Sequence, residues 1–94
     1  MPEDSTHAEI EVTISNLQGL HARPVLRFVD LASQFDSRIR IRKGKKEVDG
    51  KSPMEMMVLE APRGTRLRLV ADGRDAQAAI QALTGLIDGK FGEE

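Results

Sequence analysis

Four short segments of this chain alternate between apolar and polar residues, and this pattern limits the possible folds more than any other feature. In residues 8–15, Ile10, Val12 and Ile14 share one side of the backbone, and polar residues take the other side. The other three alternating segments are residues 37–43, 46–48 and 65–71. Alternation with a period of two predicts a strand that is buried on one face only. The four strands should therefore form a sheet with one face toward the core and one face in water.

Helical patterns fill the stretches between and after these strands. Apolar residues recur every three or four positions over residues 22–35, and again from Arg74 or Asp75 to Gly89. A shorter helix is predicted to end near Leu59. Glycine is the usual residue just after a helix, so Gly89 is expected to end the last one.

The short helix carries its own start signal. Ser52 is a typical N-cap residue, and Pro53 suits the first helical position because proline has no N–H to leave unpaired. Glu55 lies three residues after Ser52, which is the spacing of a capping box. The N-cap role alone is a complete structural explanation for Ser52.

The predicted order of elements is strand, helix, strand, strand, helix, strand, helix. With alternating strands, this order predicts an α+β open-faced β-sandwich, in which a four-stranded antiparallel sheet carries three helices on one face. The 94 residues should form one domain over residues 1–94, with residues 1–7 as a flexible tail. A chain this short has little room for a catalytic cleft, so we expect a carrier or binding module rather than an enzyme.

The composition excludes several classes of protein. The chain has no cysteine, which excludes disulfides and thiolate metal sites. His7 and His21 are the only histidines, so the ligand set for a metal site is poor, and we expect neither a metal nor a cofactor. The N-terminus lacks the basic start and apolar run of a signal peptide, and no apolar stretch is long enough to cross a membrane. We therefore expect a cytoplasmic protein with no membrane insertion.

The segment 19–24, with the sequence GLHARP, joins the first strand to the first helix. His21 should lie on an exposed turn, beside the free N–H groups and the positive dipole end of the helix. Arg23 can reach the same anion, and Pro24 fits the first helical turn. A neutral imidazole is available near pH 7 and can attack phosphorus without a separate base. A plain turn histidine is the alternative, but the whole segment favours a histidine that carries a phosphoryl group.

GLHARP resembles the active-site segment of the histidine-containing phosphocarrier (HPr) family of the bacterial sugar phosphotransferase system, whose pattern is G-[LI]-H-x-R-P. A second segment, residues 50–57 with the sequence GKSPMEMM, resembles the family's regulatory-serine segment, which is close to K-S-I-M-x-x-M. The resemblance extends from about Ala8 to the C-terminus. It implies the open-faced sandwich fold and a stoichiometric phosphocarrier that does not turn over alone.

The resemblance also implies the route of the phosphoryl group. Enzyme I would pass the group from phosphoenolpyruvate to Nδ1 of His21, and His21 would pass it to the enzyme IIA unit of a sugar permease. Arg23 would hold the phosphate oxygens through charge-assisted hydrogen bonds. A dedicated HPr serine kinase/phosphatase would act on Ser52, and a transcriptional regulator is a further implied partner. Pro53 stands where isoleucine is usual, which leaves the kinase step open.

A docking surface for these partners is predicted around His21. Methionine side chains suit a surface that meets several partners in turn, and a rim of basic residues suits an acidic groove on the donor. The predicted surface residues are Leu20, Ala22, Pro24, Arg27, Lys51, Pro53, Met54 and Met57. We expect the protein to be a monomer that binds one partner at a time.

Two other functions compete with the sugar-branch carrier. The nitrogen-related branch of the same system uses similar carriers for regulation, and the sequence does not separate the two branches. A nucleic-acid-binding domain is suggested by basic residues that the strand pattern turns outward, namely Arg38, Arg40, Arg42, Arg66 and Arg68. That face carries no aromatic residue for base stacking, and Glu9 and Glu11 share it. We therefore expect paired surface charges there and no nucleic-acid partner.

Overall fold

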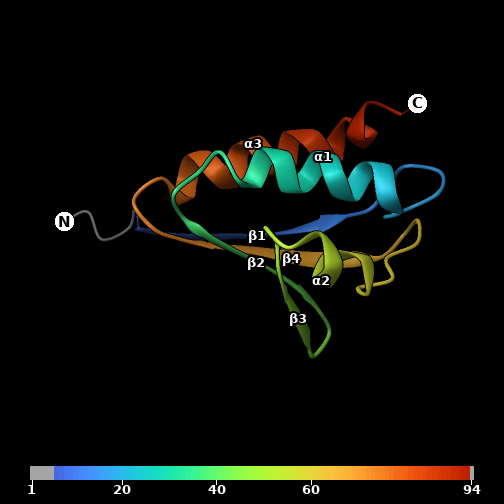
Figure 1. The fold of residues 1–94 in the computed structure, drawn as a ribbon, viewed down its shortest axis with the longest axis horizontal. Coiled ribbons are helices and arrows are strands. Elements are labelled where there is room, and N and C mark those ends of the chain that lie inside the picture. Colours follow the sequence, from blue (N-terminus) through green and yellow to red (C-terminus); the bar gives the residue numbers. More distant parts are fainter. Residues whose placement is uncertain (1–5, 94) are drawn as a thin grey trace.

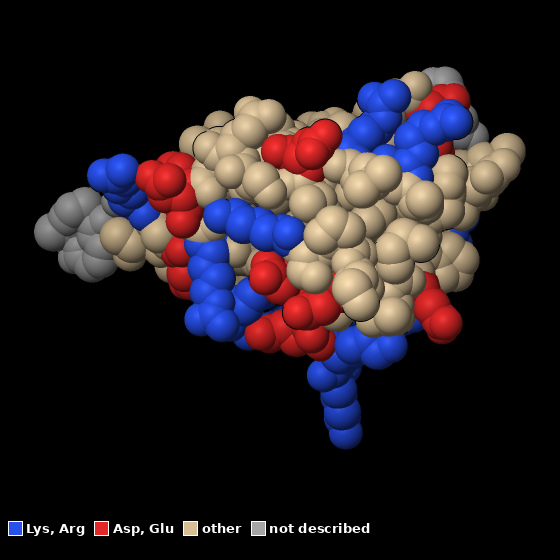
Figure 2. Space-filling view, in the orientation of Figure 1, with Lys and Arg blue, Asp and Glu red and all other residues tan. Residues whose placement is uncertain are grey.

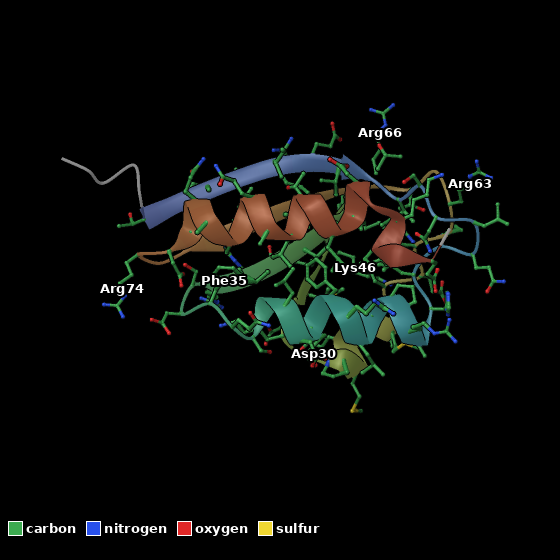
Figure 3. All side chains as sticks on the ribbon, turned by 90° about the horizontal axis from the view of Figure 1, so that it is seen from above. Asp30, Phe35, Lys46, Arg63, Arg66 and Arg74 are labelled. Carbon is green, nitrogen blue, oxygen red and sulfur yellow. The ribbon has the colours of Figure 1, made fainter. Side chains whose placement is uncertain are left out.

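The computed structural model describes residues 6–93. Its sheet has four antiparallel strands in the spatial order β1 (His7–Thr13), β4 (Arg66–Asp72), β2 (Arg38–Lys43) and β3 (Lys46–Asp49). Figure 1 shows helices α1 (Ala22–Ala32) and α3 (Ala76–Asp88) side by side over one face of the sheet, and Figure 3 shows the same pair from above. Helix α2 (Pro53–Met57) packs against α1 and β3, and a short 3₁₀ helix, η2 (Lys90–Gly92), follows α3. The predicted α+β open-faced sandwich is confirmed.

The core lies between the sheet and the helices. Leu67 and Leu69 of β4 and Ile41 of β2 are almost completely buried, and the strand register places Ile41 opposite Leu69. Phe28 of α1 and Phe91 of η2 are the two largest buried side chains. Burial of these apolar side chains supplies the main driving force for folding, and Phe91 fixes η2 to the same core as α1.

Helix α1 is shorter than the helix that the sequence pattern predicts. The pattern predicts a helix over residues 22–35, but the helix ends at Ala32. The chain then tightens into bonds between residues three apart, with Gln34 N–H donating to the Leu31 carbonyl at 3.1 Å and Phe35 N–H to the Ala32 carbonyl at 3.2 Å. Because this 3₁₀-like turn keeps Phe35 packed on the core, the apolar spacing continues past the helix itself.

Asp75 organises the end of the molecule opposite His21. It precedes α3, which begins at Ala76, but its side chain does not cap that helix. Its carboxylate instead accepts hydrogen bonds from Asp36 N–H at 2.8 Å, from Ser37 N–H at 2.9 Å and from the Ser37 hydroxyl. These bonds, the hydroxyl of Ser37 first, lower the pKa of Asp75. The residue that the sequence marks as a helix start therefore holds the turn between α1 and β2.

Charged side chains pair across the outer face of the sheet. The ring of His7 contacts two carboxylates, with Nδ1 2.5 Å from Asp72 Oδ1 and Nε2 2.8 Å from Glu9 Oε2. Glu9 also pairs with Arg68 at 3.3 Å, and Arg40 pairs with Asp72. Carboxylates of this face thus pair with Arg40, Arg42 and Arg68, which agrees with the expected charge pairing for these three residues.

His7 belongs to the sheet rather than to the tail. The sequence pattern assigns it to a flexible tail of residues 1–7, but β1 begins at His7 and pairs it with Asp72. Residues 1–5 of that predicted tail lie outside the described residues. The hydrogen bonds to Asp72 and then to Glu9 raise the pKa of His7 above its ordinary value of 6.5.

We predict that His7 makes stability fall with rising pH. A pKa that is raised in the folded state means that the bound proton stabilises the fold. This contribution is complete below pH 6.5 and is lost as the pH rises through the raised pKa. Urea unfolding of the wild type and of His7→Gln should show a stability difference at about pH 6 that shrinks by about pH 9. A difference that stays constant over this range would contradict the prediction.

Candidate functional site

His21 is the N-cap residue of α1. Its backbone is extended (φ −122°, ψ −167°), and its carbonyl accepts the first helical hydrogen bond, from Val25 N–H at 3.0 Å. The His21 side chain makes no capping hydrogen bond, and the first turn of α1 holds no acidic residue. The positive end of the helix dipole, with the N–H groups of Ala22 and Arg23, is therefore left without a carboxylate of its own. Pro24 lies in this first turn, as predicted, and is buried.

A tight turn before His21 fixes its position. Asn16 is fully buried, and its side-chain amide donates to the Gly19 carbonyl at 2.8 Å, while Gly19 N–H donates to the Asn16 carbonyl at 3.1 Å. Leu20 N–H then donates to the Ala61 carbonyl at 2.8 Å, which ties the turn to the loop after α2. Gly19 has φ +70°, and a Cβ there would lie 2.6 Å from the Ala61 oxygen. Only glycine fits both the backbone angle and the close approach.

His21 and Arg23 line the same surface hollow, which has a volume of about 380 Å³. Leu17, Gln18 and Glu93 complete its lining. Arg23 is exposed and makes no ion pair within the part of the chain that the structure describes. An imidazole, an exposed guanidinium and the N-terminal end of a helix therefore meet at one place. This combination can bind a phosphate group and bring it to a nucleophilic nitrogen.

Glu93 is a site residue that the sequence pattern does not reveal. Its Oε2 lies 3.2 Å from Nε2 of His21, and its Oε1 accepts a hydrogen bond from the Asn16 amide at 3.1 Å. The side chain of Glu93 is only 13% exposed, whereas that of His21 is 38% exposed. Nε2 itself is buried, so the exposed part of the ring lies away from this nitrogen. The burial of Asn16, by contrast, could have been predicted, because Asn16 continues the alternation that points Val12 and Ile14 toward the core.

The Ser52 side chain caps α2, and its hydroxyl accepts a hydrogen bond from Glu55 N–H at 3.2 Å. The predicted capping box is only half formed, because the Glu55 carboxylate accepts from Asp49 N–H at 2.9 Å instead of from Ser52. Pro53 takes the first helical position, as predicted. Met56 points into the core and is 1% exposed. The cap thus explains the position of Ser52 without reference to function.

An apolar surface extends from the hollow over α2. Met54 is 82% exposed and Met57 is 47% exposed, whereas Leu20 is partly buried against the core. Leu17 and Leu26 are also exposed, and neither is among the residues that the sequence predicts for this surface. Leu26 could have been found, since it lies outside the inward stripe of α1. Figure 2 shows an uncharged area over α2 and the N-terminal half of α1, with basic side chains beside it.

Two predicted basic residues of this surface differ in their surroundings. Arg27 is exposed and makes no ion pair among residues 6–93. The Lys51 ammonium donates to the Phe35 carbonyl at 2.7 Å, which holds the end of the α1 turn. Lys51 therefore has a structural contact, and Arg27 is the basic residue that is open to a partner.

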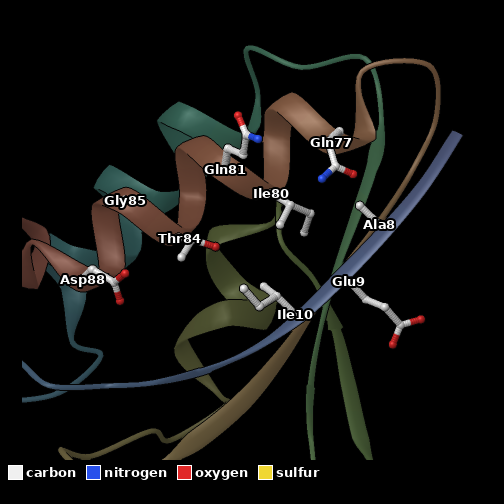
Figure 4. A pocket seen from close by; sticks show the side chains of 9 residues that line it. All are labelled: Ala8, Glu9, Ile10, Gln77, Ile80, Gln81, Thr84, Gly85 and Asp88. Atoms are coloured by element: carbon white, nitrogen blue, oxygen red, sulfur yellow. The ribbon is translucent and has the colours of Figure 1, made fainter. Parts of the chain in front are cut away.

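A second, larger hollow lies between α3 and β1, with a volume of about 520 Å³ (Figure 4). Ile10, Ile80, Gln77, Gln81 and Thr84 are among its lining residues. It contains no histidine and no basic side chain, so it lacks the groups that phosphate chemistry needs. Within residues 6–93, no three side chains are grouped so that they could hold a metal ion. None of the described helices combines the length and the apolar character of a membrane span.

Known proteins resemble this chain along most of its length. The family model described as "PTS HPr component phosphorylation site" matches residues 8–88. A phosphocarrier protein HPr from Neisseria meningitidis serogroup A is 46% identical over 82 residues, which cover 87% of this chain and 92% of the relative. A phosphocarrier protein NPr from Shewanella violacea is 41% identical and covers 94% of this chain and 97% of its own. The crystal structure of HPr-C-His from Thermoanaerobacter tengcongensis superimposes with a TM-score of 0.90 at 46% identity, covering 93% of this chain and 98% of that one.

We predict that Gly19→Ala disturbs the turn that carries His21. The matched control is Gly44→Ala, because Gly44 also has a positive φ but a Cβ there meets nothing within 4 Å. Both variants incur the backbone penalty, and only Gly19→Ala adds a clash with the Ala61 and Pro62 backbone. Chemical unfolding should therefore show Gly19→Ala to be less stable than Gly44→Ala by about 1–2 kcal/mol. Equal stabilities would show that the turn adapts to a side chain.

Proposed function

This chain belongs to the HPr family of phosphocarrier proteins of the phosphotransferase system, and from this premise we propose that His21 is the residue that carries the phosphoryl group. The observation that supports the proposal best is the position of His21 at an uncapped helix N-terminus, in one hollow with Arg23. His7 is the only other histidine, and it lies on the outer face of the sheet between two carboxylates.

In the proposed transfer, Nδ1 of His21 is the attacking atom. Nε2 is buried beside Glu93, which leaves Nδ1 as the ring nitrogen that a donor can approach. The lone pair of Nδ1 forms a bond to phosphorus, while the donor's own bond to phosphorus breaks and its electron pair stays with the donor. Arg23 and the N–H groups at the start of α1 would hold the phosphoryl oxygens. The protein acts as a carrier, so the chemistry is completed by its partners.

We propose enzyme I as the donor and an enzyme IIA unit as the acceptor. Leu17, Leu26, Met54 and Met57 are exposed, and with the partly buried Leu20 they would form an apolar docking surface next to His21. Pro24, which the sequence also predicts for this surface, is buried and would contribute little to it. The basic side chain of Arg27 would favour an acidic partner surface. A carrier that meets such partners in turn would work as a monomer in the cytoplasm.

The nitrogen-related branch is the second candidate. The NPr of Shewanella violacea is 41% identical over nearly the whole chain, so similarity does not separate the two branches. Phosphoryl transfer from a sugar-branch enzyme I and from a nitrogen-branch enzyme I, measured side by side, would assign the branch.

We further propose that Ser52 is a regulatory phosphorylation site. A phosphate at the N-terminus of α2 would be tolerated by the helix dipole, so the fold need not change. The added negative charge would lie beside Met54 on the docking surface and would oppose an acidic partner. An HPr serine kinase/phosphatase is the implied partner for this step, and a transcriptional regulator is the implied reader of the modified form.

We predict that His21→Ala abolishes phosphorylation. Incubation with phosphoenolpyruvate and a bacterial enzyme I should add one phosphoryl group to the wild type, as measured by intact-mass analysis. The added group should be lost in acid and retained in base. The control is His7→Gln, which removes the other histidine and should still be labelled. Labelling of His21→Ala under the same conditions would overturn the assignment.

We predict that Ser52→Asp slows acceptance from enzyme I. A negative charge on the docking surface should reduce the transfer rate by about tenfold, mainly through weaker association. Ser52→Ala is the control, because it removes the hydroxyl without adding charge and should transfer at nearly the wild-type rate. Stopped-flow or quench-flow transfer assays measure both variants. Equal rates for Ser52→Asp and Ser52→Ala would contradict regulation by charge.

A further inference from the structure

We propose that Glu93 is a positioning residue that holds His21 in the tautomer with its proton on Nε2. This inference rests on the proposed function of His21. The carboxylate of Glu93 faces Nε2 at 3.2 Å, although the present alignment does not yet form a hydrogen bond. A small rotation of the ring would complete one, and such bonds often tighten only when the reactants are in place.

The C-terminal segment is built to bring Glu93 to this place. Phe91 is fully buried and anchors η2 in the core. Lys90 and Phe91 both have a backbone φ of +57°, which residues other than glycine rarely adopt, and Gly92 follows with φ +74°. Three successive residues in the left-handed region turn the chain back toward α1 after α3 ends. Strain of this kind persists only where the surrounding structure enforces it, and it is often found at functional sites.

Asn16 fixes the second oxygen of the carboxylate. Its amide donates to Glu93 Oε1 at 3.1 Å and to the Gly19 carbonyl at 2.8 Å. The same side chain therefore holds both the turn that carries His21 and the carboxylate that faces His21. Because Glu93 is held at Oε1, its Oε2 remains directed at the ring.

A carboxylate at Nε2 determines which ring nitrogen can react. In neutral imidazole one nitrogen carries the proton and the other carries the lone pair. Glu93 can only accept, so it favours the proton on Nε2 and leaves the lone pair on Nδ1. When Nδ1 bonds to phosphorus and the donor departs with its electron pair, no proton needs to leave the ring. The product ring is a phosphorylated imidazolium, whose positive charge faces the Glu93 carboxylate.

The test compares Glu93→Ala and Glu93→Gln with the wild type in two measurements. A glutamine has a single carbonyl oxygen, which cannot accept from both Asn16 and His21 in the present arrangement. Glu11→Gln is the matched control, because Glu11 is an exposed carboxylate on β1, which lies in the sheet. The first measurement is ¹⁵N NMR of the His21 ring in the unphosphorylated protein, which reports the tautomer directly. The second is the rate of phosphoryl transfer from enzyme I at varied enzyme I concentration.

The wild type and Glu11→Gln should show a protonated Nε2 and an unprotonated Nδ1. Both Glu93 variants should show a mixture of tautomers, and their maximal transfer rate should fall by about threefold to tenfold. The enzyme I concentration that gives half of the maximal rate should stay unchanged, since Glu93 is largely buried and is not part of the proposed docking surface. Unchanged tautomers in folded Glu93→Ala, or an effect on half-saturation alone, would overturn the proposal. Loss of labelling in the wild type would instead overturn the proposed function of His21, and the tautomer measurement would still stand.

Discussion

The buried amide of Asn16 is the interaction on which the arrangement of the site depends. It bonds to the Gly19 carbonyl in the turn before His21 and to the Glu93 carboxylate near the C-terminus. Residues that are 77 positions apart are thereby held within one hydrogen-bonded unit. Because the amide is inaccessible to water, a lost partner could not be replaced by solvent, which makes the arrangement specific. The sheet and the helices hold the segments that carry these three residues in place.

The outer face of the sheet and the surface near His21 differ in how their charged side chains are paired. On the outer face of the sheet, His7, Glu9, Asp72, Arg40 and Arg68 contact one another, so their charges are largely satisfied within the chain. Near His21, by contrast, Arg23 and Arg27 are exposed and make no ion pair within residues 6–93, and the side chains of Met54 and Met57 are also exposed. A surface whose groups are unsatisfied in the free protein is one that gains most from a partner. Under the proposed function, this distribution of paired and exposed charges separates the outer face of the sheet from the proposed docking face.

The sequence predicts local elements better than it predicts their ends or their distant contacts. Alternation and helical spacing identify all four strands and three helices, because each pattern reflects burial on one face. They miss the end of α1 at Ala32, since Phe35 keeps the apolar spacing after the hydrogen bonding changes. They place Asp75 correctly at the start of α3, but they do not reveal its side-chain partners in the α1–β2 turn, which are 38 and 39 residues away. The contact of Glu93 with His21 is also missed, because nothing near Glu93 in the sequence indicates that it lies beside this residue.

The N-termini of α1 and α2 differ in how they are capped. Helix α2 is closed by its own cap, as the Ser52 hydroxyl accepts from Glu55 N–H. Helix α1 has no such cap, and a missing cap costs a helix about 1 kcal/mol. The carboxylate of Glu93 is directed at the His21 ring. Under the proposed function, the phosphoryl group supplies the negative charge that this terminus lacks, while Glu93 balances the positive charge that the ring gains. Both charges of the transferred state would then have a partner on opposite sides of one imidazole.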